Sequence, residues 1–279
     1  MHSADLVLIW ESVTGSEFHL HGRLPGRRGI GRGAEGVILQ SITGIGPTPS
    51  ELRRRSAARQ AGSTPGSTKV DERLVTLEVA IVATRQHTLD EVWQSWLNAW
   101  GSPGRLIFHT RRGVRHLNLQ LSRDMQLGTD IDPHRRGVLE VTVEAVATDP
   151  YAYSSQFTRD FQLSGGTGTV EVSNPCDVPV YPRFICDSPG EGWEFPDGVT
   201  GDSVPLDTIS VPGFVVDTNP LNRTIAGVDG EPQWGKLLGR GFRHAIPPRT
   251  TATEVTIEGP VDGYPSVRII LDRRWESPW

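Results

Sequence analysis

Short stretches in which apolar and polar residues alternate dominate the chain, a pattern typical of half-buried β-strands. The strongest such stretch covers residues 73–84, which are rich in Leu, Val and Ile. A hairpin is predicted from residues 105–110 and 115–122, because a short Arg-Arg-Gly turn separates these two alternating runs. Further strands of the first half are predicted at residues 5–10, 14–22, 35–44 and 137–154.

One helix is predicted, over residues 88–100, because the apolar period there fits an α-helix. Thr88 and Glu91 have the spacing of a capping box, and Gly101 stands where a glycine commonly ends a helix. Three tryptophans on the apolar stripe could form a platform for a sugar, but the pattern favours a face that covers a sheet. The stripe consists of Leu89, Val92, Trp93, Trp96, Leu97 and Trp100.

The second half of the chain shows no helical period after residue 157. Six or more short alternating stretches separated by turns predict a β-sandwich. The prolines at 175, 179 and 182 suit an edge or entry strand, because proline cannot donate to a β-ladder. The predicted fold class is mainly β, with a partly open barrel or sheet and one packed helix in residues 1–153, and a sandwich in residues 154–279.

Residues 46–73 form the longest stretch without a useful apolar pattern. The window 23–73 around them carries 10 basic and 4 acidic side chains. Long connections of this kind are uncommon in compact domains and usually have a function or are disordered. We therefore predict an arm at about 46–73 that becomes ordered against a neighbouring subunit. The candidate inter-subunit contacts are Arg53, Arg54, Arg55 and Arg59.

Composition narrows the class of protein. The 279 residues are 36% hydrophobic and 22% charged, as in folded proteins, and the net charge of −5 predicts no dominant basic face for nucleic acid. No apolar run approaches the length of a secretory signal or a membrane span, so membrane insertion is not expected. Cys176 and Cys186 leave two possibilities open, namely two buried thiols or one strand-to-strand disulfide.

Motifs for catalysis or cofactor binding are weak. Residues 31–36 match a dinucleotide-binding loop by letter, but a strand-like stretch follows where a helix is needed. The acidic turns 130–132 and 217–219 do not continue as calcium loops. His19 and His21 lie on one face of a predicted strand, and they could meet His109 or His116 across the sheet. We predict no enzymatic activity, and no catalytic, cofactor-binding or metal-binding residues.

The order of these elements resembles the first domain of distal tail proteins of long-tailed phages. Residues 71–122 contain a long strand, one helix and a hairpin, and residues 137–154 contain a strand that leads into Asp-Pro-Tyr. The passage GTVEVSNPCDVPVYPRF resembles the entry into the galectin-like second domain of that family. Four later stretches are similar to minor tail proteins of actinobacterial phages, namely residues 216–225, 234–242, 246–248 and 275–279.

The resemblance implies a split β-barrel with a belt-like arm, a galectin-like β-sandwich and a structural role without enzymatic activity. It further implies a ring, expected to be a hexamer, at the tail tip of a virion, after synthesis in the host cytoplasm. The implied partners are further copies of the chain, the tail tube protein, the tape measure protein, and tail-tip hub or receptor-binding proteins. Such a ring would enclose the DNA channel without binding nucleic acid of its own accord.

Two other functions are weighed against this one. A carbohydrate-binding sandwich module would use exposed tryptophans as stacking platforms, and Trp193 and Trp234 are the candidates, although core or interface packing is the alternative for both. A cell-wall glycoside hydrolase would need two carboxylates that are close in space, and such pairs have no sequence signature.

Overall fold

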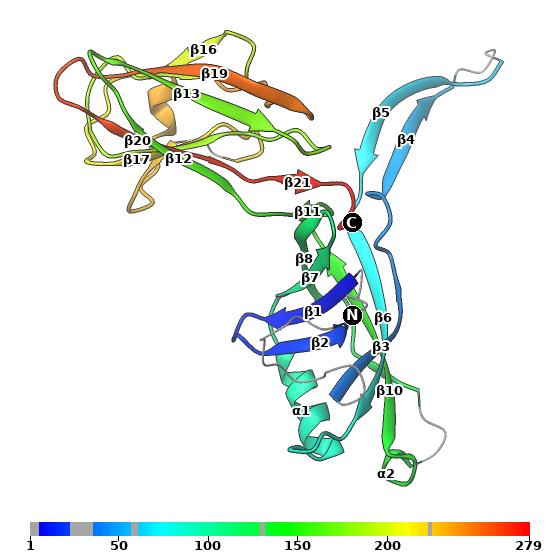
Figure 1. Cartoon of the computed structure of the whole chain (residues 1–279). Helices are drawn as coiled ribbons and strands as arrows, with labels where there is room; N and C mark the ends of the chain where they lie inside the picture. The colour runs from blue at the N-terminus through cyan, green and yellow to red at the C-terminus, as the bar shows by residue number, and fades with distance from the viewer. Residues whose placement is uncertain (1–5, 23–35, 57–60, 129–131, 223–224) are drawn as a thin grey trace. The chain divides into compact units, whose positions relative to one another are not determined.

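The chain forms two compact units, which are Met1–Tyr153 with Glu276–Trp279, and Ser154–Trp275 (Figure 1). Most of the regular structure in both units is β, which confirms the prediction of a mainly β chain. The last four residues pack with the first unit, whereas the sequence analysis assigned them to the second domain. The structure is a computed structural model, and it describes residues 6–22, 36–56, 61–128, 132–222 and 225–279.

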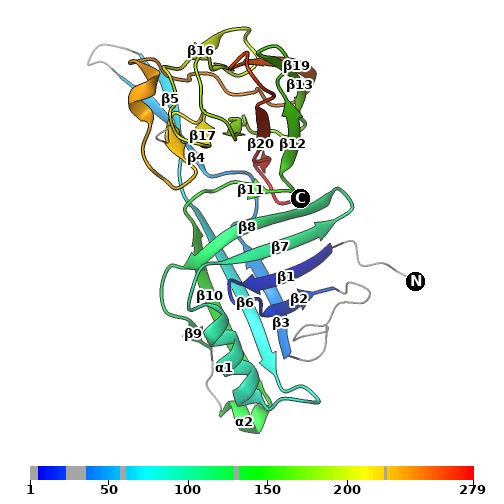
Figure 2. The same cartoon turned by 90° about the vertical axis from the view of Figure 1, so that its left-hand side faces the viewer.

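The first unit is built on a curved antiparallel sheet with the strand order β2-β1-β7-β8-β10-β6-β3 (Figure 2). β6 and β10 pair along their whole length, whereas β8 and β10 share only the pairs at Ala145 and Val146. β2 and β3, at the two ends of the order, contact each other. The sheet is therefore a barrel that is split between β8 and β10. Its strands are β1 (Leu6–Ser12), β2 (Glu17–His21), β3 (Gly36–Thr43), β6 (Arg73–Val82), β7 (Gly104–Thr110), β8 (Gly113–Leu121), β9 (Gln126–Leu127), β10 (Val138–Ala147) and β11 (Ala152–Tyr153).

Helix α1 (Leu89–Ala99) lies where the sequence predicts a helix, and its apolar face covers the sheet. The capping box is present, because the backbone N–H of Glu91 donates to Thr88 Oγ1 and Glu91 Oε2 accepts from the backbone N–H of Thr88. The ring of Trp100 stacks on that of Trp10 in β1, with ring centroids 3.7 Å apart. Gly104 is required beside this pair, because a Cβ there would lie 2.5 Å from the Trp10 ring. Trp96 and Trp100 are thus packing residues, whereas Trp93 is half-buried.

A second helix, α2 (Pro133–Arg136), has no counterpart in the sequence analysis. It contains only four residues, which is too few for an apolar period to be recognised. Asp132 caps it by accepting from the backbone N–H of His134, and Gly137 ends it in the left-handed conformation.

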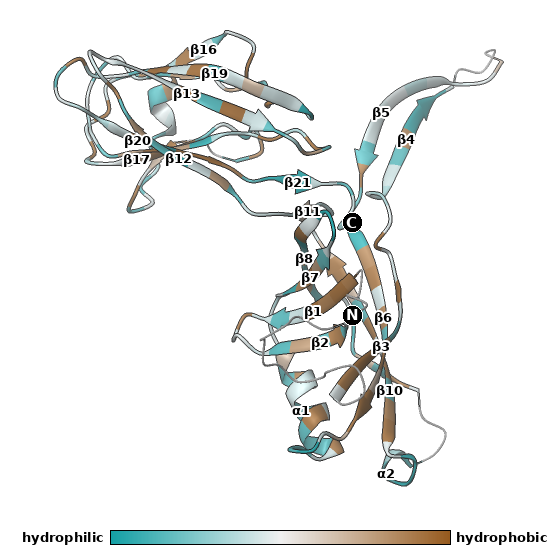
Figure 3. Cartoon of the chain, viewed as in Figure 1, coloured by the Kyte–Doolittle hydropathy of each residue, from teal (hydrophilic) through white to brown (hydrophobic). Residues whose placement is uncertain are grey.

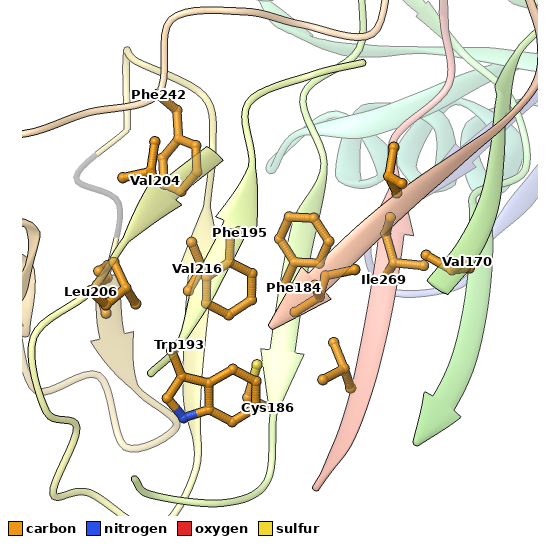
Figure 4. Close-up of a cluster of buried hydrophobic side chains, with 14 of the residues drawn as sticks. Val170, Phe184, Cys186, Trp193, Phe195, Val204, Leu206, Val216, Phe242 and Ile269 are labelled. Atoms are coloured by element: carbon orange, nitrogen blue, oxygen red, sulfur yellow. The ribbon is translucent and has the colours of Figure 1, made fainter. Parts of the chain in front are cut away.

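The second unit is a sandwich of a five-stranded sheet, β12-β20-β14-β17-β18, and a four-stranded sheet, β13-β19-β15-β16. Alternate residues of the strands point into a common core, of which Trp193, Phe184 and Phe195 form the aromatic centre (Figure 4). The strands of the sandwich are β12 (Phe157–Gln162), β13 (Thr167–Asn174), β14 (Arg183–Cys186), β15 (Glu194–Pro196), β16 (Ser203–Pro205), β17 (Phe214–Asp217), β18 (Ile225–Gly227), β19 (Thr250–Glu258) and β20 (Ser266–Leu271), with the 3₁₀ helix η1 (Trp234–Leu237). The short β21 (Arg274–Trp275) belongs to neither of these two sheets.

The proline-rich stretch before β14 was expected to belong to an edge or entry strand, and the edge alternative is wrong. β14 lies between β20 and β17, so it is a central strand and not an edge strand. The prolines are tolerated because they occupy the connection that ends before Arg183. The buried side chain of Asn174 holds this connection, since its amide nitrogen donates to the carbonyls of Val178, Ile246 and Pro247.

Candidate assembly surface

The predicted arm is a β-hairpin of its own, made of β4 (Ser50–Arg55) and β5 (Thr64–Val70). Every residue of both strands is exposed. No strands are predicted here from the sequence, because neither strand has a buried face that would impose an alternating pattern. Figure 3 shows the contrast between the brown β6 and β10 and the largely teal and white hairpin. We call this hairpin the arm.

The arm is held by its ladder rather than by a core. Glu51 lies opposite Lys69, which places opposite charges side by side across the two strands. The register then shifts between Leu52 and Arg54. Gly66 lies opposite this irregularity, and a Cβ at Gly66 would approach the carbonyl oxygen of Arg53 to 2.8 Å. The bulge therefore depends on a glycine, and an exposed two-stranded ladder of this kind is only marginally stable without a partner.

Three of the four arginines predicted as inter-subunit contacts, Arg53, Arg54 and Arg55, are exposed on β4. Arg59 lies outside the described residues. In the described part of the chain β4 and β5 pair only with each other, so the outer edge of each strand presents backbone donors and acceptors. A guanidinium adds planar donors that suit carboxylates of a partner. Contact between these arginines and another subunit stays a prediction.

Sequence reasoning missed two apolar residues of the arm. Leu52 and Val70 are 43% and 42% exposed. Both lie on one face of the hairpin, because Leu52 is opposite Thr68 and Val70 is opposite Ser50. The charged residues around them hid this pair from a search for an apolar period.

The tryptophans proposed as sugar platforms have opposite environments. Trp193 is 1% exposed and stacks on Phe195 inside the sandwich, so the platform hypothesis is wrong for this residue. Trp234 is 61% exposed on η1. Sugar binding at Trp234 stays a prediction.

A surface pocket of about 300 Å³ brings acidic side chains together, as the hydrolase alternative requires. Glu194 and Glu258, on β15 and β19, are directly opposite each other in this pocket, and Glu194 accepts a hydrogen bond from the Ser203 hydroxyl. Asp202 and Glu254 also line it. Such a group of acids fits many roles, and it does not by itself indicate hydrolysis.

The weaker motifs have structural explanations where they are described. β1 lies between β2 and β7, so the predicted histidine pairs do not meet on neighbouring strands. In the dinucleotide-like motif, residues 31–35 lie outside the described residues and Gly36 begins β3. Asp217 accepts from the backbone N–H of Asn219 and from the side chain of Asn222, which stabilises its turn. In the other acidic turn, only Asp132 is described.

Both cysteines, Cys176 and Cys186, are buried thiols rather than partners in a disulfide, which decides the alternative left open by the sequence. Burial raises the pKa of Cys186 well above its usual value. Across the described residues, no group of three or more His, Cys, Asp or Glu side chains is arranged to hold a metal ion. Of the helices in this same part of the chain, none has the length and apolar character needed to cross a membrane.

Two curated relatives match the chain over nearly its whole length. The minor tail protein Gp27 of Mycobacterium phage L5 is 23% identical, over 99% of this chain and 98% of the relative. The minor tail protein Gp27 of Mycobacterium phage D29 is 21% identical, also over 99% of this chain and 98% of the relative. Both relatives support the interpretation of this chain as a phage tail protein. No protein-family model matches the chain.

Solved structures with the same fold come from phage tails. The Dit protein (gp 19.1) of phage SPP1, described as a paradigm of the hub adsorption apparatus in phages that infect Gram-positive bacteria, has a TM-score of 0.60. It is 13% identical to this chain, and the match covers 96% of this chain and 98% of that one. A chain of the phage p2 baseplate in its activated conformation has a TM-score of 0.53 at 8% identity, over 96% of this chain and 98% of that one.

These findings confirm three predictions. The chain is a structural tail protein and not an enzyme, because the whole-length relatives are tail proteins. Its expected place in the virion tail is confirmed by the same relatives. The predicted mainly β fold is shared with the SPP1 Dit protein. The hydrolase alternative has no support from any of these proteins.

Proposed function

We propose that this chain is a distal tail protein of the Dit type, which forms a ring of identical subunits at the tail tip. The observation that carries the proposal is the fold shared with the SPP1 Dit protein across 96% of the chain. The minor tail relatives support the same position in the virion. The expected copy number is six, as the family resemblance implies.

The arm is proposed to be the contact between neighbouring subunits. A closed ring of identical chains needs a heterologous interface, in which one surface of each copy meets a different surface of the next. The arm suits this role because its strand edges, its arginines and the pair Leu52 and Val70 are all exposed in the single chain. Docking on a neighbour would cover the open edges and the apolar pair at the same time.

The ring is proposed to join the tail tube to the host-recognition apparatus. Its partners would be the tail tube protein and the tape measure protein on one side, and tail-tip hub or receptor-binding proteins on the other. The role is mechanical, so no cofactor is needed. The ring would surround the channel through which DNA passes without reading its sequence.

Native mass spectrometry of the full chain tests the proposal. We expect a homo-oligomer from the wild-type chain, and monomers or smaller assemblies when residues 50–68 are deleted. Both units should still unfold cooperatively in the deletion variant, because the arm is exposed along its whole described length. Replacement of Arg53, Arg54 and Arg55 by Gln should weaken the assembly less than the deletion, since the strand edges and Leu52 remain.

A matched control replaces two exposed arginines outside the arm, Arg112→Gln and Arg135→Gln, and should leave the oligomer unchanged. An unaltered oligomer mass after deletion of the arm would remove its proposed role. A wild-type chain that is monomeric both in isolation and in intact particles would remove the ring itself.

A further inference from the structure

The arm is connected to β3 and β6 of the first unit through a joint in which the β-ladder is interrupted. β3 and β6 pair with each other, and β4 and β5 pair with each other, but residues 44–49 and 71–72 between them belong to no strand. One backbone hydrogen bond, from Asp71 N–H to the Pro49 carbonyl, spans the joint at 3.1 Å. No continuous ladder therefore links the arm to β3 and β6, so side-chain contacts at the joint gain importance.

Arg73 provides most of these contacts. It is the first residue of β6 and is fully buried, at 0% exposure. Its Nη1 donates to the carbonyls of Gly44 and Gly46 at 3.0 and 2.7 Å, and its Nη2 lies 3.4 Å from Thr48 Oγ1. These three acceptors all lie in residues 44–49, the connection between β3 and β4. Arg73 thus holds the joint from the side of β6.

The remaining donors of Arg73 reach two distant parts of the first unit. Nε donates to the Pro150 carbonyl at 2.7 Å, and Nη2 donates to the Glu276 carbonyl at 2.7 Å. All its acceptors are uncharged, and no carboxylate of the described residues pairs with the guanidinium. Burial lowers the pKa of Arg73 from its ordinary value. A buried guanidinium that is stabilised only by neutral carbonyl and hydroxyl oxygens needs every one of these acceptors. The loss of any acceptor leaves an N–H donor that is buried without a hydrogen bond.

The residues Glu276–Trp279, here called the terminal segment, are fixed at this place by further contacts. Thr48 Oγ1 donates to the Glu276 carbonyl at 3.2 Å, which links the segment directly to the joint. Arg115, on β8, donates to the Ser277 carbonyl at 2.7 Å. The ring of Trp279 meets that of Phe108 edge-on, with ring centroids 5.8 Å apart. Backbone carbonyls, rather than side chains, make the bonds to Arg73, Thr48 and Arg115.

We infer that the terminal segment is a strap that locks the joint of the arm through Arg73. Gly44 shows how closely the joint is packed, because a Cβ there would lie 1.8 Å from the Leu74 carbonyl oxygen. The chain passes between the two units at Tyr153–Ser154 and at Trp275–Glu276. Arg73 donates to the carbonyls of Pro150 and Glu276, and each of these residues is close in sequence to one of the two places where the chain passes between the units. A displacement of the chain at either place would therefore disturb the hydrogen bonds of Arg73 that hold the joint.

A role of the joint in ring assembly would rest on the proposed function, whereas the strap itself does not. Hydrogen exchange measured by mass spectrometry on the full chain, diluted until it is monomeric, tests the strap alone. Deletion of residues 276–279 should speed exchange in residues 44–49 and 71–72 by about tenfold or more, which corresponds to about 1.4 kcal/mol of opening free energy. Exchange in the β6–β10 ladder should stay unchanged.

Ser277→Ala is the matched control, because it changes a side chain of the segment and keeps the carbonyls that accept from Arg73 and Arg115. It should exchange like the wild type. Arg73→Lys keeps the charge but offers three donors from one atom, so it should loosen the joint to an intermediate degree.

Unchanged exchange at the joint after the deletion would overturn the inference. A uniform increase across the whole first unit would overturn it as well, since the segment would then be part of the general core. If the strap behaves as expected while the wild-type chain never oligomerises, the proposed function fails and the inference stands. The reverse result, a normal ring with no change at the joint, removes only the strap.

Discussion

Residues of one type take different roles in this chain according to what surrounds them in space. Trp193 and Trp234 both follow glycine-rich or polar stretches in the sequence, yet one is 1% exposed and the other 61%. Arg73 is fully buried, whereas Arg53 to Arg55 are exposed on the arm. The arginine-rich composition therefore serves two purposes: Arg73 satisfies carbonyls inside the first unit, while the arm arginines stand on the surface proposed to bind a neighbour.

His116 gives a prediction at the same scale. Its ring stacks on that of Tyr153, with ring centroids 5.8 Å apart. Burial, with a smaller effect from the charge of Arg105, lowers the pKa of His116 below its ordinary value of 6.5. The unfolded chain then binds the proton more tightly than the folded chain. The stabilising contribution is present above pH 6.5 and is lost as the pH falls through the lowered pKa.

We therefore expect the free energy of unfolding of the first unit to decrease as the pH falls from about 7.5 to about 5.5. His116→Gln should make this dependence shallower, as measured by urea denaturation at several pH values. His134→Gln is the control, because the side chain of His134 is 63% exposed. Equal slopes for the wild type and His116→Gln would contradict the assigned cause.

At the scale of elements, the arm shows how a strand can form without an apolar period. β4 and β5 pair with each other as a two-stranded ladder, and neither strand covers a core. β14 shows the converse, since a proline-rich approach precedes a central strand. Local composition indicated an arm at the first place and an edge or entry strand at the second, but the position in the sheet depended on partners far away in the sequence.

The joint of the arm gives a prediction for this scale. Gly44 has a φ of +81°, and a Cβ on it would overlap the Leu74 carbonyl. Gly44→Ala should destabilise the first unit by about 3 kcal/mol, because backbone strain and steric overlap add. Gly46→Ala is the matched control, since a Cβ there meets nothing within 4 Å. In calorimetry, Gly44→Ala should unfold at a lower temperature than Gly46→Ala. Similar unfolding temperatures for the two variants would show that the backbone of the joint can shift to accept a Cβ at residue 44.

At the scale of the whole molecule, the proposed function depends on copies of the chain rather than on one site. The acidic pocket near Glu194 and the exposed Trp234 are local features, whereas the fold likeness to the SPP1 Dit protein extends over 96% of the chain. A structural role spreads over the molecule in this way, because an assembly interface needs shape and edges more than reactive groups.

Salt dependence of the proposed ring separates two kinds of arm contact. If Arg53, Arg54 and Arg55 meet carboxylates of a neighbour, a rise in NaCl from about 0.1 M to about 1 M should shift the ring toward smaller species, as the Debye length falls from about 10 Å to about 3 Å. The triple Gln variant should lose this sensitivity in sedimentation experiments. A wild-type ring that is indifferent to salt would assign the contact to the strand edges and to Leu52 and Val70.

The sequence by itself determined the elements that rest on local periodicity. Alternation at every second residue predicts strands such as β6 and β10, and the stripe after Thr88 predicts α1, because backbone geometry fixes these periods within a few residues. It also showed that the stretch at 46–73 lacks a core-facing pattern, and the residue order alone carried the resemblance to distal tail proteins.

Only the tertiary structure decided which residues meet. Arg73 collects acceptors from residues 44–48, Pro150 and Glu276, and the last of these is 203 positions away. No period links such residues, so neither the strap nor the burial of Trp193 has a sequence signature. The physical reason is that chain contacts across this distance form only once the sheets have closed, whereas propensity and amphipathic pattern act between near neighbours.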